Sequence, residues 1–192
     1  MNHTKIKDHL KVIKITGRSS TINGVFAQAI APRDDYDLGR ITVALQFLGQ
    51  DIDTDLRCVF CNDAATTWDH LTGTVKDGEL RGFGHQIGNL APCCGSCNSA
   101  KGKKSINDFI DSSERIKCDR RELIDLLTRY QNTFASEIEL TVLDDSEDYR
   151  NYIMLRDQII ELMKKADALA GNIRPLLEID SIDNRSPTPN IE

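Results

Sequence analysis

The residues best suited to chemistry in this sequence are two Cys-x-x-Cys pairs, Cys58 with Cys61 and Cys94 with Cys97. Four thiolates in two such pairs are a typical ligand set for a tetrahedral structural Zn²⁺. Cys93 could replace Cys94, although the Cys-x-x-Cys turn better presents its backbone N–H groups to the sulfurs. We therefore predict a zinc site that joins the two ends of the intervening segment, with the choice between Cys93 and Cys94 left open.

An acid, an imidazole and an amide accompany these cysteines. Asp69 and His70 lie between the two pairs, and Asn98 directly follows the last cysteine. Carboxylate and amide oxygens are hard ligands for Mg²⁺, which usually keeps several positions for water and phosphate. A neighbouring imidazole can then take a proton from an attacking water. Asp69, Asn98 and His70 are therefore candidates for metal-assisted phosphodiester hydrolysis.

The chain has 192 residues, a mass of 21.5 kDa and a formal net charge of −6. That length predicts one domain, or one domain with appendages. No signal peptide or membrane span is evident, so we expect a cytoplasmic protein whose cysteines bind metal and do not form disulfides.

The negative net charge fits a nucleic-acid binder poorly unless the charge is unevenly distributed. The excess of acid lies in residues 105–192, whereas residues 1–50 carry more Lys and Arg than Asp and Glu. Lys101, Lys103 and Lys104 form a basic run after the second cysteine pair, either as a solvated helix end or as phosphate contacts. His85 is either a solvated loop histidine or a further phosphate contact.

Hydrophobic spacing predicts the elements around these residues. Strands are expected near residues 10–15 and 138–142, and helices at residues 38–48, 119–134 and 149–170. Gly49 and Gly171 are expected to end the first and last of these helices, and Ser105 and Asp119 to begin helices as N-caps. Trp68 is expected in the core.

The pattern as a whole resembles the HNH, or ββα-metal, endonuclease family, in the subgroup with a four-cysteine zinc. The resemblance covers about residues 58–104. It rests on the cysteine pairs, on Asp69-His70, on Asn89-Leu90-Ala91-Pro92, and on Asn98-Ser99-Ala100-Lys101 after the last cysteine. Two departures are Cys93, where the family has an apolar residue, and Leu71-Thr72-Gly73, which replaces the usual apolar-apolar-Pro after the histidine.

The resemblance implies a role for each matched residue. His70 would be the general base, Asp69 and Asn98 would hold a catalytic Mg²⁺ or Mn²⁺, and Asn89 would brace the loop that orients His70. Lys101, Lys103, Lys104 and His85 are the candidate DNA contacts. The expected fold is α+β, with a central ββα-metal module at residues 55–104. A small N-terminal extension (1–54), a mainly helical C-terminal region (105–180) and a disordered tail (181–192) would surround it.

The function implied is a metal-dependent DNA endonuclease acting on double-stranded DNA. The segments outside the module suggest a type II restriction enzyme working as a homodimer. Alternatives are a phage or mobile-element nicking or homing nuclease, a junction-cleaving nuclease, or a zinc module that binds nucleic acid without catalysis. In that last case Asp69 and His70 would only form a turn.

Overall fold

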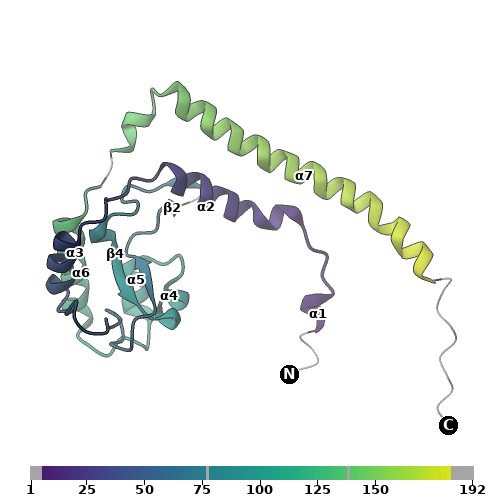
Figure 1. The fold of residues 1–192 in the computed structure, drawn as a ribbon. Coiled ribbons are helices and arrows are strands. Elements are labelled where there is room, and N and C mark those ends of the chain that lie inside the picture. Colours follow the sequence, from purple (N-terminus) through teal and green to yellow (C-terminus); the bar gives the residue numbers. More distant parts are fainter. Residues whose placement is uncertain (1–5, 77, 138, 183–192) are drawn as a thin grey trace, which may run out of the picture. The chain divides into compact units, whose positions relative to one another are not determined.

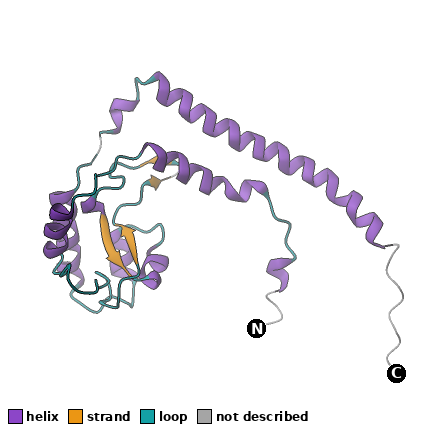
Figure 2. Ribbon diagram, in the orientation of Figure 1, coloured by secondary structure: helices purple, strands orange, loops and turns teal. Residues whose placement is uncertain are grey.

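The computed structural model describes residues 6–76, 78–137 and 139–182. The chain divides into two compact units, Gly24–Asp145 and Met1–Asn23 with Ser146–Glu192. The elements are mostly helices, with two small antiparallel sheets (Figures 1 and 2), so the coarse α+β prediction is confirmed. Among the described residues no helix is both long and apolar enough to cross a bilayer.

Four helices of the Gly24–Asp145 unit begin at side-chain or sulfur caps. These helices are α3 (Leu38–Phe47), α4 (Gly95–Lys101), α5 (Ile106–Ser112) and α6 (Arg120–Phe134). Ser105 accepts a hydrogen bond from the amide of Asp108, and Asp119 accepts one from Glu122, which confirms both predicted N-caps. Gly49 follows α3 with a φ of 70°, as expected of a glycine that ends a helix.

The larger sheet of this unit contains two strands. β1 (Thr67–His70) pairs antiparallel with β4 (Leu90–Cys93), so that Asp69 lies opposite Ala91 and His70 opposite Leu90. The chain then passes through Cys94 into α4, which contacts β1. The order is therefore strand, strand, helix. The second sheet, β2 (Val75–Lys76) with β3 (Glu79–Leu80), is a short hairpin between β1 and β4.

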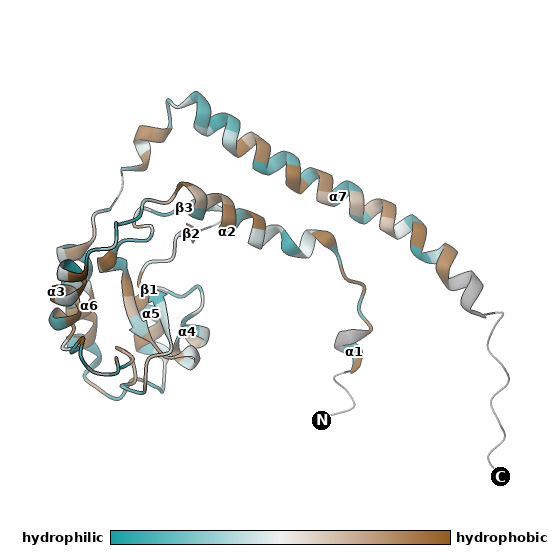
Figure 3. Ribbon diagram, in the orientation of Figure 1, coloured by the Kyte–Doolittle hydropathy of each residue, from teal (hydrophilic) through white to brown (hydrophobic). Residues whose placement is uncertain are grey.

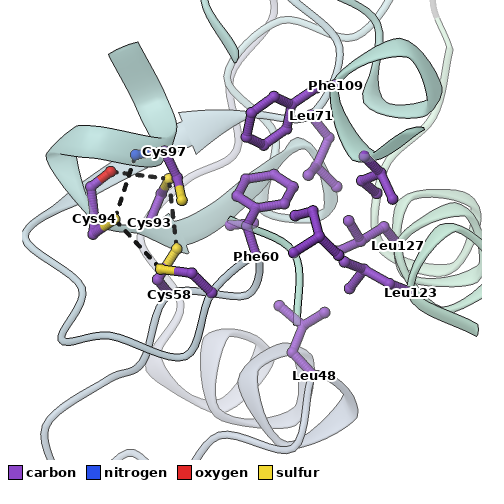
Figure 4. Close-up of a cluster of buried hydrophobic side chains, with 14 of the residues drawn as sticks. Leu48, Cys58, Phe60, Leu71, Cys93, Cys94, Cys97, Phe109, Leu123 and Leu127 are labelled. Atoms are coloured by element: carbon purple, nitrogen blue, oxygen red, sulfur yellow. Dashed lines mark hydrogen bonds between the residues drawn. The ribbon is translucent and has the colours of Figure 1, made fainter. Parts of the chain in front are cut away.

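An apolar core fixes these elements against α3, α5 and α6. Phe60 and Phe109 meet edge to face with ring centroids 5.1 Å apart, and both are almost fully buried. Leu71, directly after β1, and Leu127 of α6 belong to the same cluster, next to the cysteines (Figure 4). The compact unit therefore includes helices on both sides of residues 55–104 in the sequence.

The other unit contains α1 (Ile6–His9), the 3₁₀ helix η2 (Ile15–Arg18), the first turn of α2 (Ser19–Ile30) and the long helix α7 (Glu147–Ile182). The carboxylate of Asp167 on α7 accepts hydrogen bonds from the amides of Ile15 and Thr16 and from the Thr16 hydroxyl, at 2.7, 3.1 and 2.6 Å. Asp167 therefore attaches η2 to α7.

Both predicted strands outside residues 55–104 are wrong. Residues 10–15 lead into η2, whose amides bond to a carboxylate and not to a partner strand. The second segment forms the 3₁₀ helix η4 (Leu140–Leu143), while residue 138 lies outside the described residues. Apolar residues are frequent at residues 10–15 and alternate at Ile138, Leu140 and Val142 in the sequence, but a strand also requires a neighbour to pair with.

Two further predictions are corrected, and one lies outside the structure. α7 continues through Gly171 to Ile182, because Gly171 does not adopt the positive φ of a terminating glycine. Trp68 is 47% exposed, since β1 turns the neighbouring Asp69 inward and Trp68 outward. Of the predicted tail, residues 183–192 lie outside the described residues.

Candidate metal centre and adjoining histidine site

The four predicted zinc ligands converge in the structure. The Sγ atoms of Cys58, Cys61, Cys94 and Cys97 all lie within 4.8 Å of one another, and all four residues are buried. The Cys61 and Cys94 sulfurs are 3.7 Å apart. A tetrahedral site with Zn–S bonds of about 2.3 Å has sulfurs roughly 3.8 Å apart. The donor set and its spacing therefore fit a structural zinc ion.

The second cysteine turn favours Cys94 over Cys93 as the ligand. The amide of Cys97 donates a hydrogen bond to the Cys94 sulfur at 3.4 Å, which is the arrangement expected of a Cys-x-x-Cys turn. Cys93 ends β4 opposite Thr67, and its sulfur lies 3.3 Å from the carbonyl oxygen of Cys94. The Cys93 sulfur is also 3.9 Å from that of Cys58, so Cys93 packs beside the cluster (Figure 4).

Arg115 contributes a positive charge that the sequence did not single out. Its Nε donates to the Cys97 sulfur at 3.3 Å, and its guanidinium lies 3.5 Å from the carboxylate of Asp63. Four thiolates around one Zn²⁺ leave a net negative charge, which a nearby guanidinium offsets. Arg115 lies beyond α5, so its proximity depends on how α5 packs and no local motif reveals it.

Asp69 forms a buried ion pair with Lys101 of α4. The ammonium Nζ lies 3.1 Å from Oδ2 and donates to Oδ1 at 3.4 Å and to the His70 carbonyl oxygen at 2.7 Å. The Lys101 and Asp69 side chains are 3% and 9% exposed. Burial raises the pKa of Asp69, and the charge of Lys101 opposes that shift.

This pairing corrects the expectation that Lys101 contacts phosphate, because its ammonium group is directed inward. Lys103 and Lys104 are exposed and remain candidates for a surface contact. The three lysines are close in sequence, but only Lys101 lies within α4, where the helix turns its side chain toward β1.

His70 and His85 form a pair in contact. His70 Nε2 lies 2.9 Å from His85 Nδ1, so one nitrogen donates to the other, and the ring centroids are 5.0 Å apart. Burial, followed by the positive charges of His85 and Lys101, lowers the pKa of His70 to about 4. The His70 imidazole is therefore neutral near pH 7, and the same lowering of its pKa makes it a weaker base. His85 is part of this site and is not an isolated loop residue.

Asn89 braces the segment that follows His70. It is fully buried, and its Oδ1 accepts from the Thr72 amide at 2.8 Å. Its Nδ2 donates to the carbonyl oxygens of Thr72 and Gly84, both at 2.9 Å. Asn89 thus connects the residues just after His70 with the residue just before His85. Gln131 of α6 donates to Asn89 Oδ1 at 2.8 Å, a contact that sequence reasoning missed.

Backbone hydrogen bonds to Pro32 and Asp34, near the N-terminal end of this unit, also hold His85. The His85 amide donates to Pro32 at 2.8 Å, and its carbonyl accepts from Asp34 at 3.2 Å. Gly84 has a φ of 44°, and a Cβ there would lie 2.2 Å from the Pro32 oxygen. The crowding at Gly84 is a tertiary contact with Pro32 that the sequence analysis did not identify.

Asn98 lies in the first half of α4 and is half-buried. It precedes Lys101 by three residues, which places the two on one side of the helix. Because the Lys101 side chain reaches Asp69, this side of α4 is the one directed to β1. Asn98 therefore lies on the side of α4 that carries Lys101, next to the contact of Lys101 with Asp69.

The residues expected to hold a catalytic divalent cation fit that role only in part. Oδ2 of Asp69 is buried and accepts no hydrogen bond among the described residues, which leaves a lone pair for a cation. The ammonium of Lys101 already neutralises this carboxylate, however, so a second cation would compete with it. The four cysteines fit a zinc ion, whereas Mg²⁺ or Mn²⁺ at Asp69 would compete with the ammonium group of Lys101.

Comparisons with protein-family models, with curated proteins and with solved structures find no match to this chain.

Proposed function

We propose that this protein is a metal-dependent DNA endonuclease that uses His70 as its general base. The observation that carries the proposal is the position of His70, at the end of the first strand of a strand, strand, helix unit joined by four cysteines. Asn89 braces the adjoining loop. The resemblance to HNH endonucleases supplies the family, and these contacts are consistent with it.

The chain's own groups account for the proton transfer and the positioning. Neutral His70 accepts a proton from an attacking water, and the contact with His85 restrains the orientation of its ring. Exposed Lys103 and Lys104 hold phosphates of double-stranded DNA. A Mg²⁺ or Mn²⁺ ion held by Asp69 and Asn98 would neutralise charge on the phosphate and on the leaving oxygen. A zinc ion held by Cys58, Cys61, Cys94 and Cys97 would maintain the scaffold.

The test is cleavage of plasmid DNA with Mg²⁺ or Mn²⁺ by the native protein, by His70→Ala and by Thr67→Ala. Loss of a positioned base costs about 10²- to 10⁴-fold in rate. His70→Ala should show this loss while zinc content stays unchanged. Thr67→Ala, on the same strand, should cleave normally. A His70→Ala protein with more than about a tenth of native activity would refute the assignment of the base.

The finer proposal is a type II restriction enzyme, and the products of the same assay test it. A sequence-specific enzyme gives discrete bands, whereas a nonspecific nuclease gives a smear. A phage or mobile-element nuclease acting at rare sites, or a junction-cleaving enzyme, would leave most plasmids uncut or only nicked.

A zinc module that binds nucleic acid without cleaving it is the second candidate. The ion pair between Lys101 and Asp69 favours it, because a neutralised carboxylate is a weaker ligand for a divalent cation. No turnover with either metal, together with salt-dependent binding to a DNA duplex, would support this second function.

A further inference from the structure

The long helix α7 carries a repeating apolar seam, most of which is exposed. Leucine recurs every seven residues, at Leu155, Leu162, Leu169 and Leu176. Three residues before each of them stand Tyr152, Ile159, Ala166 and Ile173. The alternating steps of three and four residues are those of the a and d positions of a coiled coil, with leucine at every d. We call these eight positions the a/d seam.

Exposure distinguishes this seam from the neighbouring side of the helix. The four leucines are 53%, 62%, 62% and 64% exposed, and Ile159 and Ile173 are 37% and 53% exposed. By contrast, Met163, Asp167 and Ala170 on the adjacent side are half-buried, and Asp167 holds η2. The 3₁₀ helix η2 therefore occupies one side of α7 through Asp167, while six of the eight seam positions are exposed and Tyr152 and Ala166 are half-buried. Apolar (brown) and polar (teal) stretches alternate along α7 (Figure 3).

The seam suits a second copy of the same helix. From Leu155 to Leu176 it extends over 21 residues, or about 32 Å of helix, and a sustained heptad pattern of three to four repeats is the usual signature of a coiled coil. Isoleucine at a and leucine at d favour two parallel strands, because each side chain then fits between four of the facing helix.

Charges beside the seam permit that parallel arrangement. In a parallel pair, the residue just before an a position of one helix (position g) lies opposite the residue just after a d position of the other helix (position e). These pairs would be Gln158 with Met163, Lys165 with Ala170, and Asn172 with Leu177, while Arg156 opposite Asn151 is buried and already paired with Asp157. None brings like charges together. Pro175, the one proline inside the helix, falls between Ile173 and Leu176 and outside the seam.

We propose that α7 forms a parallel, two-stranded coiled coil with α7 of a second copy of this chain. The inference rests on the helix alone and not on the proposed nuclease function. Two copies joined in this way would each keep a four-cysteine site and a His70–His85 site.

Sedimentation of the full chain without DNA tests the association, and adjacent residues provide a matched pair of variants. Leu155 is in the seam and 53% exposed, whereas Met154 is outside it and 50% exposed. The native protein and Met154→Glu should be dimers. Leu155→Glu should shift the equilibrium toward the monomer and increase the dissociation constant of the dimer at least tenfold. A native monomer at tens of micromolar, or equal effects of the two variants, would overturn the proposal.

Cross-linking tests the parallel orientation. In a Cys118→Ser background, Leu155→Cys should give a disulfide-linked dimer under mild oxidation, because the two Leu155 positions face each other only in a parallel pair. Met154→Cys is the control and should cross-link much less. A dimer in sedimentation that fails to cross-link through Leu155→Cys would refute the parallel arrangement. If α7 associates only with a different protein, the proposal that it pairs with a second copy of this chain is refuted.

Discussion

The ammonium group of Lys101 lies 3.1 Å from a carboxylate oxygen of Asp69, and both side chains are buried between β1 and α4. Lys101 also donates to the His70 carbonyl oxygen at 2.7 Å, so one side chain neutralises Asp69 and fixes the end of β1. Lys101, which was expected to contact DNA, is therefore part of the protein interior. Any cation that binds Asp69 must compete with this ammonium group.

Removing Lys101 should destabilise the protein strongly. Breaking a buried ion pair from one side typically costs about 3–5 kcal/mol, because the remaining charge stays buried and uncompensated. Lys101→Met should show a loss of this size in urea unfolding, whereas Lys103→Met, at an exposed position, should change stability by less than about 0.5 kcal/mol. Adding Asp69→Asn to Lys101→Met should recover much of the loss. Equal effects of the two lysine changes would contradict the buried pair.

The cysteine cluster should bind one zinc ion per chain, and four of the five neighbouring cysteines should be needed. Cys58→Ser, Cys94→Ser or Cys97→Ser should lose zinc and unfold the Gly24–Asp145 unit, since the binding energy of a structural zinc contributes directly to folding. Cys93→Ser should keep its zinc. Elemental analysis with circular dichroism measures both effects. Loss of zinc from Cys93→Ser but not from Cys94→Ser would reverse the ligand assignment.

Asn89→Ala should destabilise the loop between His70 and His85. The change leaves the Thr72 amide and the Gly84 carbonyl without their Asn89 partner, and each buried polar group left unpaired costs about 1–3 kcal/mol. Denaturant unfolding should show a loss of about 2 kcal/mol or more. Asn132→Ala makes the same chemical change at an exposed position of α6 and should be nearly neutral. Similar results for both would argue against the bracing role.

Gly84→Ala should displace His85 from His70. A methyl group at this position meets the Pro32 oxygen, and the φ of 44° is unfavourable for alanine. Strain of this kind costs about 1–3 kcal/mol, which should appear as a lower melting temperature. The imidazole NMR signals of His70 should shift as well. Gly73→Ala is the control, because no atom lies within 4 Å of the added Cβ. An unshifted His70 signal in Gly84→Ala would contradict the coupling.

Asp167 should make the attachment of η2 to α7 sensitive to acid. Hydrogen bonds from Thr16 and Ile15 lower the pKa of Asp167 in the folded chain. A lowered pKa means that this contribution is fully present above the unfolded value near 3.8 and is lost as the pH falls through the folded pKa. Hydrogen exchange at Ile15 and Thr16 should therefore be slow at pH 6 and accelerate below about pH 4 relative to its intrinsic rate. Asp167→Asn should exchange faster at pH 6, and an unchanged rate would contradict the contact.

Local chemistry in the sequence was sufficient for several features. The cysteine spacing predicted which sulfurs converge, because each Cys-x-x-Cys turn brings its own pair together before any tertiary contact forms. Ser105, Asp119 and Gly49 marked helix ends for the same reason, since a cap bonds to backbone groups a few residues away. The role of Asn89 as a brace followed from the family resemblance, and the hydrogen bonds agree with it.

Other features depended on contacts between distant residues. Lys101 looked like a surface residue in sequence, and only the packing of α4 on β1 directed it to Asp69. The contact of His85 with His70 depends on Gly84 and Pro32, and that of Arg115 with Cys97 on the placement of α5. The segments at residues 10–15 and 139–142 are rich in apolar residues, but among the described residues neither pairs with a strand. A side chain's type and spacing determine what it can bind, whereas burial and the partners available in three dimensions decide what it does bind.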